Sequence, residues 1–385
     1  MIAVGADVIE DVRARLASAG GEVTAFRVAQ ALRSAGRPVG DATVLAVHQA
    51  LSREVLGAGP LEPLLRVPGV SDVLVNGPDD VWIDCGAGLE RAPVRFADEA
   101  AVRLLAQRLA ALGGRRIDDA TPHVDVRLPD GTRFHAVLAP TARPGTVLSL
   151  RVGHDRRFSL EDLIAAGAVP PDGGELLRRM VAGRLAFIVS GGTGTGKTTV
   201  LSSLLGLVDP GERIVLVEDA SELRPPHPHV VGLEARPANA EGVGEITLRT
   251  LVRQALRMRP DRLVVGEVRG AEVVEMLAAL NTGHAGGCAT VHANSAAHVP
   301  ARIEALALAA GLGRSAAHSQ LAGALDAVIH LARGRDGRRR VVEVAVPVRG
   351  SDGLVSMRTA YAFEAGGLVP GRAAEALAAR LGEVT

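Results

Sequence analysis

The segment that most restricts the fold is the glycine-rich stretch SGGTGTGKTTV at residues 190–200. It follows the apolar run AFIVS and leads into the helical pattern TTVLSSLLGLV, so a strand, a tight loop and a helix are predicted in succession. The spacing Gly191-x4-Gly196-Lys197-Thr198 fits the pattern GxxxxGK[ST], in which glycines let successive backbone N–H groups point at one anion at a helix N-terminus. Such a loop is typical of an α/β domain built on a parallel sheet.

The choice of basic residues singles out one position of this loop. Of the 43 lysine and arginine residues, Lys197 is the only lysine. A compact ammonium can reach the β- and γ-phosphates of ATP from inside the loop, whereas the planar guanidinium of arginine is too wide to do so in the same way. The Thr198 hydroxyl is the expected ligand of Mg²⁺. The residues predicted to bind Mg-ATP are Gly191, Gly192, Thr193, Gly194, Thr195, Gly196, Lys197, Thr198 and Thr199.

The chain has 385 residues, 47% of them hydrophobic, which is enough for two or three domains with sizeable cores. Its periodicity changes along the sequence. We predict a helical N-terminal region at 1–56 and an α+β domain at 57–153, with hairpins around 76–80 and 129–131, a helix at 99–114 and a strand at 146–153. A linker at 154–160 precedes an α/β domain at 161–385, which closes with two strands and a helix at 372–382.

Within 161–385, short apolar runs without alternation are separated by helical segments. The runs are LAFIVS, RIVLVED, DRLVVGEV and GCATVHA. Runs of this kind favour a mostly parallel sheet that is buried on both faces.

Acidic residues follow two of these predicted strands. Glu218 and Asp219 come after one apolar run, and Glu267 comes after another. The carboxyl ends of strands in an open α/β sheet converge beside the ligand, where a carboxylate can hold Mg²⁺ or orient the attacking water. We predict Glu267 as the catalytic base and Glu218 as a second catalytic carboxylate, both able to serve the metal. Asp219 fits a simple helix-capping role equally well.

Two histidines and two arginines complete the candidate set. His284 and His292 are eight residues apart, a spacing unlike the HExxH zinc helix, and a histidine at a strand end can contact a γ-phosphate. The alternative is a core histidine bonded to the backbone. Arg133 and Arg151 lie on predicted strands of 57–153, where ordinary solvated surface arginines are also expected.

Composition excludes several classes of protein. The net charge is zero, which argues against a dedicated nucleic-acid binder, and the basic run RGRDGRRR at 333–340 is interpreted as a solvated hairpin turn. Two distant cysteines, Cys85 and Cys288, cannot form a tetracysteine zinc site and suit a reducing cytoplasm. The sequence shows neither a signal peptide nor an apolar run that could span a bilayer, so any membrane role is expected to come through a partner.

In this order, SGGTGTGKTT, VEDASEL, LVRQALRMRPDRLVVGEVRG and NTGHAGGCATVHANSA resemble the secretion ATPases of type II and type IV systems and pili. LGAGPLEPLL, VSDVLVNGPDDVWID, GRRIDDATPHVDVRLPDGTRFHAV and LSLRV further upstream resemble the CpaF-like branch, which drives tight-adherence (Tad/Flp) pili. The similarity runs from about residue 55 to 345.

The resemblance implies a RecA-like ATPase domain preceded by a PAS-like domain. It implies that Glu218 and Asp219 form an Asp box, that Glu267 is the catalytic glutamate of Walker B, and that His284 and His292 form a His box. Arg133 and Arg151 match arginines with which the first domain clamps the nucleotide.

The resemblance also implies a homo-hexameric ring at the cytoplasmic face of an inner-membrane platform, where ATP hydrolysis powers assembly of a pilus or secretion. Three alternatives stay open: a conjugation-type ATPase that moves DNA or protein, a DNA-acting RecA-like motor, and a non-hydrolysing scaffold that depends on nucleotide.

Overall fold

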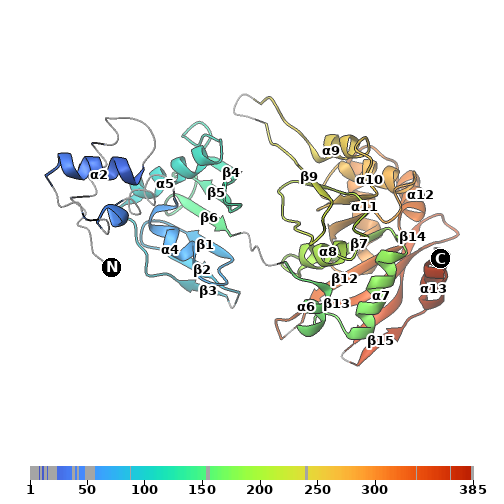
Figure 1. The fold of residues 1–385 in the computed structure, drawn as a ribbon. Helices are drawn as coiled ribbons and strands as arrows, with labels where there is room; N and C mark the ends of the chain where they lie inside the picture. Colours follow the sequence, from blue (N-terminus) through green and yellow to red (C-terminus); the bar gives the residue numbers. More distant parts are fainter. Residues whose placement is uncertain are drawn as a thin grey trace. The chain divides into compact units, whose positions relative to one another are not determined.

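The computed structural model describes residues 57–86, 88–152, 157–238, 242–334, 336–364 and 366–382, and in the N-terminal region 24–36, 43–47 and positions 8, 11, 12, 15 and 40. The chain divides into two compact units, Met1–His154 and Asp155–Thr385 (Figure 1).

The first unit begins with a small helical cluster. Helix α2 (Ala25–Ser34) starts at Thr24, whose side chain accepts a hydrogen bond from the backbone N–H of Arg27. Val28 and Leu32 on its buried face pack in one cluster with Val12 and Val47. The helix predicted in the middle of 1–56 is therefore present, and most of the other residues of this predicted helical region lie outside the described ones.

A six-stranded antiparallel sheet forms the body of the first unit, in the order β3-β2-β1-β6-β5-β4. Both predicted hairpins are confirmed, since β1 pairs with β2 and β4 pairs with β5. The predicted helix is also present, as α5, and its apolar side chains share a core with one face of the sheet. The elements are η1 (Gly59–Leu61), α4 (Glu62–Leu65), β1 (Asp72–Val75), β2 (Val81–Asp84), β3 (Leu89–Arg91), α5 (Glu99–Leu112), β4 (His123–Arg127), β5 (Arg133–Val137) and β6 (Val147–Arg151).

A nine-stranded sheet organises the second unit, in the order β15-β14-β13-β12-β7-β11-β10-β8-β9. The six strands from β12 to β9 pair in parallel, and the C-terminal strands β13, β14 and β15 add to it antiparallel. The strands are β7 (Phe187–Gly191), β8 (Ile214–Glu218), β9 (Val230–Glu234), β10 (Arg262–Val265), β11 (Cys288–His292), β12 (Ala327–Arg333), β13 (Arg339–Arg349), β14 (Val355–Glu364) and β15 (Gly367–Pro370).

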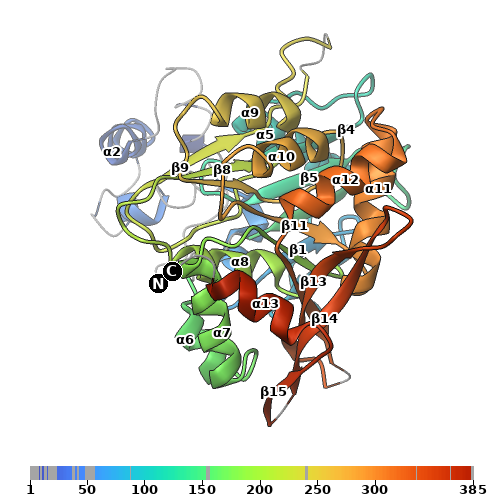
Figure 2. The same cartoon turned by 90° about the vertical axis from the view of Figure 1, so that its right-hand side faces the viewer.

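Helices cover both faces of this sheet (Figures 1 and 2). Alternate residues of one strand enter different cores: Phe187 and Val189 pack with α6, α7, α8 and α13, whereas Ile188 packs with α9 to α12. The prediction of a sheet buried on both faces is confirmed. The helices are α6 (Leu160–Ala165), α7 (Pro171–Ala182), α8 (Lys197–Leu205), α9 (Leu248–Ala255), α10 (Glu272–Leu280), η2 (Ala296–His298), α11 (Val299–Ala309), α12 (Arg314–Ala324) and α13 (Ala374–Gly382).

The beginning of the second unit is fixed by a capping box. Ser159 accepts from the backbone N–H of Asp162, and the Asp162 carboxylate accepts from the backbone N–H of Ser159. Helix α6 therefore begins at Leu160, at the end of the predicted linker, of which residues 154–156 lie outside the described ones.

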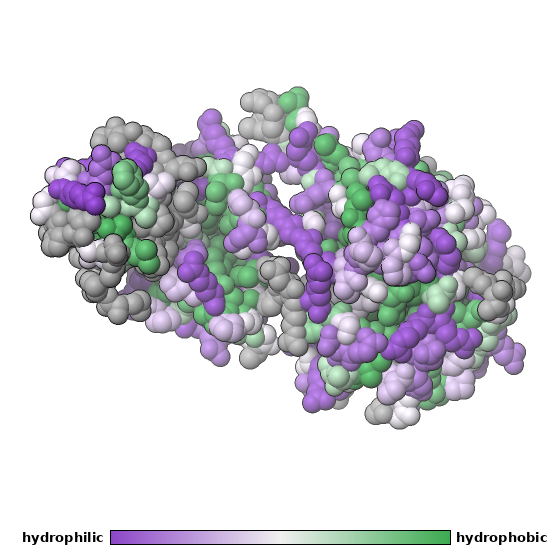
Figure 3. All heavy atoms as spheres, viewed as in Figure 1, coloured by the Kyte–Doolittle hydropathy of each residue, from purple (hydrophilic) through white to green (hydrophobic). Residues whose placement is uncertain are grey.

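The surface mixes hydrophilic and hydrophobic side chains, as the face drawn in Figure 3 shows. The exposed large apolar side chains come from elements of both units, which is ordinary for globular proteins. They include Phe26, Leu45, Leu89, Leu104, Leu112, Val243, Leu308 and Val369. Among the helices in the described parts of the chain, none has the length and apolar character to cross a bilayer.

Candidate active site

The phosphate loop lies between the end of β7 and the start of α8, as the sequence predicts. Gly196 takes the N-cap position of α8 with φ 92°, a left-handed conformation that favours glycine. A Cβ on Gly191 would lie 2.6 Å from Oγ1 of Thr195 and 2.7 Å from the carbonyl oxygen of Leu331. Glycine is therefore required at both ends of the loop, where the backbone turns tightly against β12.

Hydrogen bonds within the loop hold Lys197 over its own backbone. Oγ1 of Thr195 donates to the carbonyl of Gly192 at 2.9 Å. Nζ of Lys197 donates to the carbonyls of Gly192, at 2.9 Å, and Gly191, at 3.3 Å. Burial lowers the pKa of the Lys197 ammonium, and the nearby Glu267 carboxylate opposes that shift. The loop thus presents one poorly solvated cation that gains from an anionic partner.

Three segments far apart in the sequence meet at this lysine. His292 is the last residue of β11 and lies opposite Gly191 in the strand register. Both of its ring nitrogens are 3.4 Å from Nζ of Lys197, and its Nε2 is 2.6 Å from Oε1 of Glu267. The loop after β7, the end of β11 and the segment after β10 therefore form one cluster.

His292 is half-buried in this cluster, and its pKa is lowered, first by burial and then by the positive charge of Lys197. A neutral imidazole at pH 7 follows from that direction. A neutral ring offers one N–H donor and one acceptor nitrogen, so it can face the ammonium and a polar ligand at once.

One carboxylate oxygen of this cluster has no hydrogen-bond donor. Oε1 of Glu267 is buried and, despite its short distance to His292, receives no aligned hydrogen bond from any described residue. The other oxygen, Oε2, accepts from the guanidinium of Arg269. Among the described residues, Oε2 of Glu275 on α10 also lacks a donor, so it is the position of Oε1 of Glu267 beside the phosphate loop that suits it to accept a hydrogen bond from a water molecule.

Glu218, the last residue of β8, is buried beneath the neighbouring strand end. A Cβ on Gly266 would lie 2.7 Å from Cγ of Glu218, so only glycine fits before Glu267. Oε1 of Glu218 accepts from the backbone N–H groups of Glu222 and Leu223, both at 2.9 Å. Burial raises the pKa of the Glu218 carboxyl to about 7 despite these bonds.

The structure does not bring His284 into this cluster. It precedes β11, at the edge of the sheet opposite to His292, and its Nδ1 is 3.2 Å from the carbonyl of Ala279. That is the geometry of a histidine with a backbone partner, the alternative that the sequence left open.

Arg133 and Arg151 belong to the first unit, where they are cross-strand neighbours on β5 and β6. Arg133 makes a two-pronged ion pair with Asp125, at 2.7 and 3.1 Å, and Arg151 pairs with Asp72 at 3.1 Å. Both guanidinium groups are partly exposed. The two arginines thus form one charged row on a sheet face.

The fit of Mg²⁺ depends on the phosphate loop more than on a cage of side chains. Within the described ranges, His, Cys, Asp and Glu side chains form no group of three or more that could hold a metal ion. Mg²⁺ in nucleotide sites uses one or two protein ligands together with phosphates and water. Thr198, half-buried at the first turn of α8, and the nearby carboxylates suit that small donor set.

Sequence analysis missed Arg269 and a buried pair below the loop. Ser190 directly precedes Gly191, and its Oγ is 2.9 Å from Nδ1 of His330, on the adjacent strand β12. Burial lowers the pKa of His330. The position of Arg269, two residues after Glu267 in VGEVRG, was a usable signal, whereas nothing in the sequence paired Ser190 with His330, 140 residues away.

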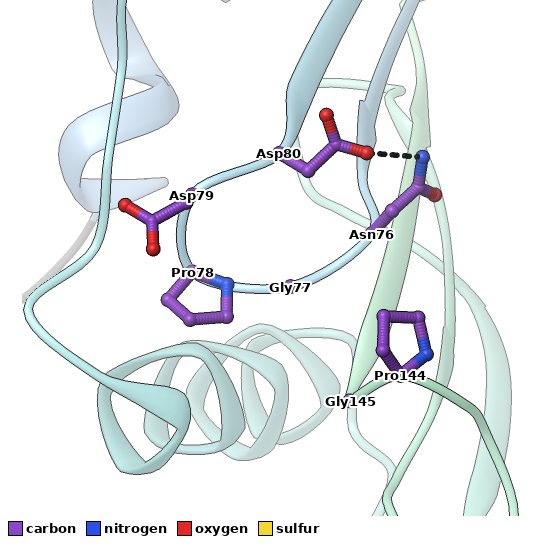
Figure 4. Close-up of a pocket in the computed structure, with 7 residues that line it drawn as sticks. All are labelled: Asn76, Gly77, Pro78, Asp79, Asp80, Pro144 and Gly145. Carbon is purple, nitrogen blue, oxygen red and sulfur yellow. Dashed lines mark hydrogen bonds between the residues drawn. The ribbon is translucent and has the colours of Figure 1, made fainter.

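A separate small pocket lies in the first unit (Figure 4). It is lined by the β1–β2 turn and by Pro144 and Gly145, and Nδ2 of Asn76 donates to Oδ2 of Asp80 at 3.3 Å. None of the predicted site residues lines it.

Comparison with known proteins gives matches that span both units of the chain. A family described as "Type II/IV secretion system protein" matches residues 54–361. The chain is 57% identical over 334 residues to a "Putative conjugal transfer protein" of Mycobacterium tuberculosis, covering 85% of this chain and 95% of that protein. It is 30% identical to the type IV secretion system protein PtlH of Bordetella pertussis, covering 74% and 92% of the two chains.

Among solved structures, the pilus retraction motor PilT with bound ADP has a TM-score of 0.53, with 20% identity and coverage of 74% of this chain and 81% of that one. That likeness supports the fold.

Proposed function

We propose that this chain, which belongs to the type II/IV secretion system protein family, hydrolyses ATP with Mg²⁺. The energy of hydrolysis would drive a secretion or pilus machine. The observation that carries the proposal is the cluster of Lys197, His292 and Glu267, in which a buried acceptor oxygen lies beside a desolvated cation of a phosphate loop.

Binding follows from the loop. Backbone N–H groups of residues 192–198 and the helix N-terminus of α8 attract the phosphates, and Lys197 exchanges its two backbone carbonyl acceptors for phosphate oxygens. Thr198, with Glu218 and Glu267 as further candidates, would hold Mg²⁺, which neutralises charge on the phosphates when it is bound.

Hydrolysis requires an oriented water molecule. The donor-free Oε1 of Glu267 is the acceptor for that water, and the guanidinium of Arg269 fixes the orientation of the carboxylate through Oε2. Neutral His292, between Glu267 and Lys197, can donate to a γ-phosphate oxygen without adding a charge of its own. Glu218 keeps the segment after β8 in place through its bonds to residues 222 and 223.

The motor part of the proposal uses the first unit. The paired row of Arg133 and Arg151 supplies cations that can exchange Asp125 and Asp72 for nucleotide phosphates. We propose that the first unit is the PAS-like domain of a homo-hexameric ring of the CpaF-like, Tad/Flp branch. The ring would work in the cytoplasm at the inner face of the plasma membrane, bound to inner-membrane platform proteins.

A second candidate is a conjugation-type ATPase that moves DNA or protein. The 57% identical relative carries the description "Putative conjugal transfer protein", which favours this candidate. The zero net charge favours the pilus machine, because binding to nucleic acid ordinarily uses a strongly basic surface.

Phosphate release from Mg-ATP by the purified full chain tests the proposal. The wild-type chain is expected to release phosphate, and Glu267→Gln is expected to bind ATP but to lose most of its turnover, since an amide cannot act as the base. Absence of release from the wild-type chain, or equal rates in the two chains, would contradict the proposal. Stimulation by added DNA would favour the conjugation-type or DNA-acting motor.

Arg151→Ala tests the contribution of the first unit. It is expected to lose turnover and to keep some nucleotide binding, because the phosphate loop is intact. Unchanged turnover would make Arg151 an ordinary surface arginine.

A further inference from the structure

The hairpin between β12 and β13 places one arginine against the phosphate loop. Strand β12 is the direct neighbour of β7, with Leu331 opposite Gly191, so the end of β12 continues alongside the loop that follows β7. Arg339, the first residue of β13, pairs across the hairpin with Arg333. A Cβ on Gly196 would lie 3.7 Å from Cδ of Arg339, an ordinary van der Waals distance, so the stem of this side chain lies on the loop.

The guanidinium of Arg339 differs from those of two other arginines of the hairpin. Arg340 forms an ion pair with Asp336, and Nε of Arg333 donates to the carbonyl of Gly337 at 2.9 Å. Arg339 is exposed, and within the described part of the chain its side chain makes no hydrogen bond or ion pair. Contacts within the hairpin thus engage the guanidinium groups of Arg333 and Arg340. The guanidinium of Arg339, beside Gly196, is free to bind a ligand.

We propose that Arg339 is a nucleotide-binding residue whose guanidinium contacts the phosphate chain of ATP bound in the loop. A guanidinium offers several N–H donors in one plane and binds phosphate oxygens in a two-pronged manner. The stem of Arg339 already lies against the residue that caps α8, which places its guanidinium close to the loop that would hold the phosphates. The inference rests on the proposed function, because it assumes that the loop binds ATP.

The same geometry changes the interpretation of the basic run 333–340. A solvated turn explains Arg338, which is exposed and has no atom within 4 Å of a Cβ position on Gly196. It does not explain why the neighbouring arginine is laid on the loop. One residue of the run serves the site, and Arg338 provides a control of equal charge one position away.

The test compares ATP binding by the full chain carrying Arg339→Gln or Arg338→Gln. We expect Arg339→Gln to weaken ATP binding about tenfold and Arg338→Gln to change it less than twofold, with Arg339→Lys intermediate because it keeps the charge and loses the planar fork. Both positions are exposed, so thermal unfolding of the two glutamine variants is expected to match that of the wild-type chain. Inorganic tripolyphosphate, used as a competitor, is expected to lose the same factor as ATP in Arg339→Gln.

Two outcomes would overturn the inference while leaving the proposed function intact. One is ATP binding by Arg339→Gln equal to that of a wild-type chain that does bind ATP. The other is a loss for ATP without any loss for tripolyphosphate, which would place Arg339 on the nucleoside. Failure of the wild-type chain itself to bind ATP would contradict the proposed function and overturn this inference with it.

Discussion

Charged residues are buried at both ends of the parallel strands of the nine-stranded sheet, but the contacts that compensate these charges differ between the two ends. At the edge where the parallel strands begin, Arg262 is 2% exposed, and its Nε and Nη2 lie 2.6 and 3.2 Å from the two carboxylate oxygens of Glu212. Its Nη2 also donates to the carbonyl of Val181 at 3.1 Å, and its Nη1 donates to that of Gly286 at 3.5 Å. At the ends of the strands, Lys197 has no carboxylate of the described residues as a hydrogen-bond partner, and the short contact between His292 and Oε1 of Glu267 is not aligned as a hydrogen bond.

The comparison separates one buried charge that is paired within the fold from a group of poorly compensated charges beside the phosphate loop, although Nε of Arg213, just before β8, also lacks an acceptor in the described part of the chain. Arg262 has an acceptor for each of its nitrogens, so its charge is fully used in the fold. At the other edge, burial lowers the pKa values of Lys197 and His292, raises that of Glu218, and leaves one oxygen of Glu267 without a donor. Ionisable groups with shifted pKa values are typical of catalytic sites. Four substitutions can break or sharpen this contrast.

The largest effect is expected from Lys197→Arg. The wider guanidinium cannot occupy the interior of the loop, so turnover is expected to fall by at least about 1000-fold, as when a main electrostatic contact to the transition state is lost. Arg338→Lys, the reverse exchange at an exposed position outside the loop, is the matched control and is expected to stay near the wild-type rate. Normal hydrolysis by Lys197→Arg would refute our explanation of the single lysine.

Arg262→Met tests the opposite edge. It leaves Glu212 with only the partly exposed Arg184, whose Nη2 lies 3.5 Å from Oε2, so we expect the free energy of unfolding to fall by about 3 kcal/mol. Turnover per folded molecule should be unchanged, because Arg262 is at the far ends of the strands from the loop. Arg178→Gln removes an exposed ion pair with Glu161 and should leave denaturant unfolding close to that of the wild-type chain. Equal losses for both variants, or a loss of turnover in folded Arg262→Met, would erase the contrast.

The raised pKa of Glu218 predicts that the stability of the fold depends on pH. Its pKa is raised from 4.5 to about 7 in the folded chain, so the folded state holds a proton that the unfolded state has released. Stability from this group is therefore complete below pH 4.5 and falls as pH rises to 7, by up to about 3 kcal/mol. Glu218→Gln cannot titrate, so it should match the wild-type chain near pH 4 and exceed it near pH 8 in denaturant unfolding. A difference independent of pH would show that the Glu218 carboxyl is not desolvated.

The smallest effects on turnover are expected from substitutions of the two histidines. His292→Asn is expected to lower turnover about tenfold, since one hydrogen bond to a charged group contributes about 1.5 kcal/mol at the low end of its range. His284→Asn should remain within about twofold of the wild-type rate, because its partner is a backbone carbonyl at the other edge. Phosphate-release rates at one pH decide between them, and equal losses would restore a shared role for the two histidines.

Local signals in the sequence predicted much of this architecture. The phosphate loop, both hairpins of the first unit, α5 and the buried parallel strands follow from turn residues and apolar periodicity over short windows. Strand β9 was not predicted, because the segment PHPHVVGLE begins with prolines and histidines, which are not typical of a strand. Its strand conformation depends on pairing with β8.

Contacts between distant strands were beyond the sequence. Ser190 meets His330 because β12 pairs with β7, and Arg339 meets Gly196 because β13 follows β12 in the hairpin beside the loop. His284 and His292 have similar neighbours in the sequence, but β11 runs between them, so they lie at opposite ends of this strand.

The most direct test of the contrast is the thermal unfolding of the full chain with and without Mg-ATP. A ligand at about 100 times its Kd stabilises the folded state by about 2.7 kcal/mol, and we expect the wild-type chain and His284→Asn to gain a similar rise in Tm. Lys197→Ala should gain none. No rise in the wild-type chain, or an equal rise in Lys197→Ala, would contradict the assignment of nucleotide binding to this edge of the sheet.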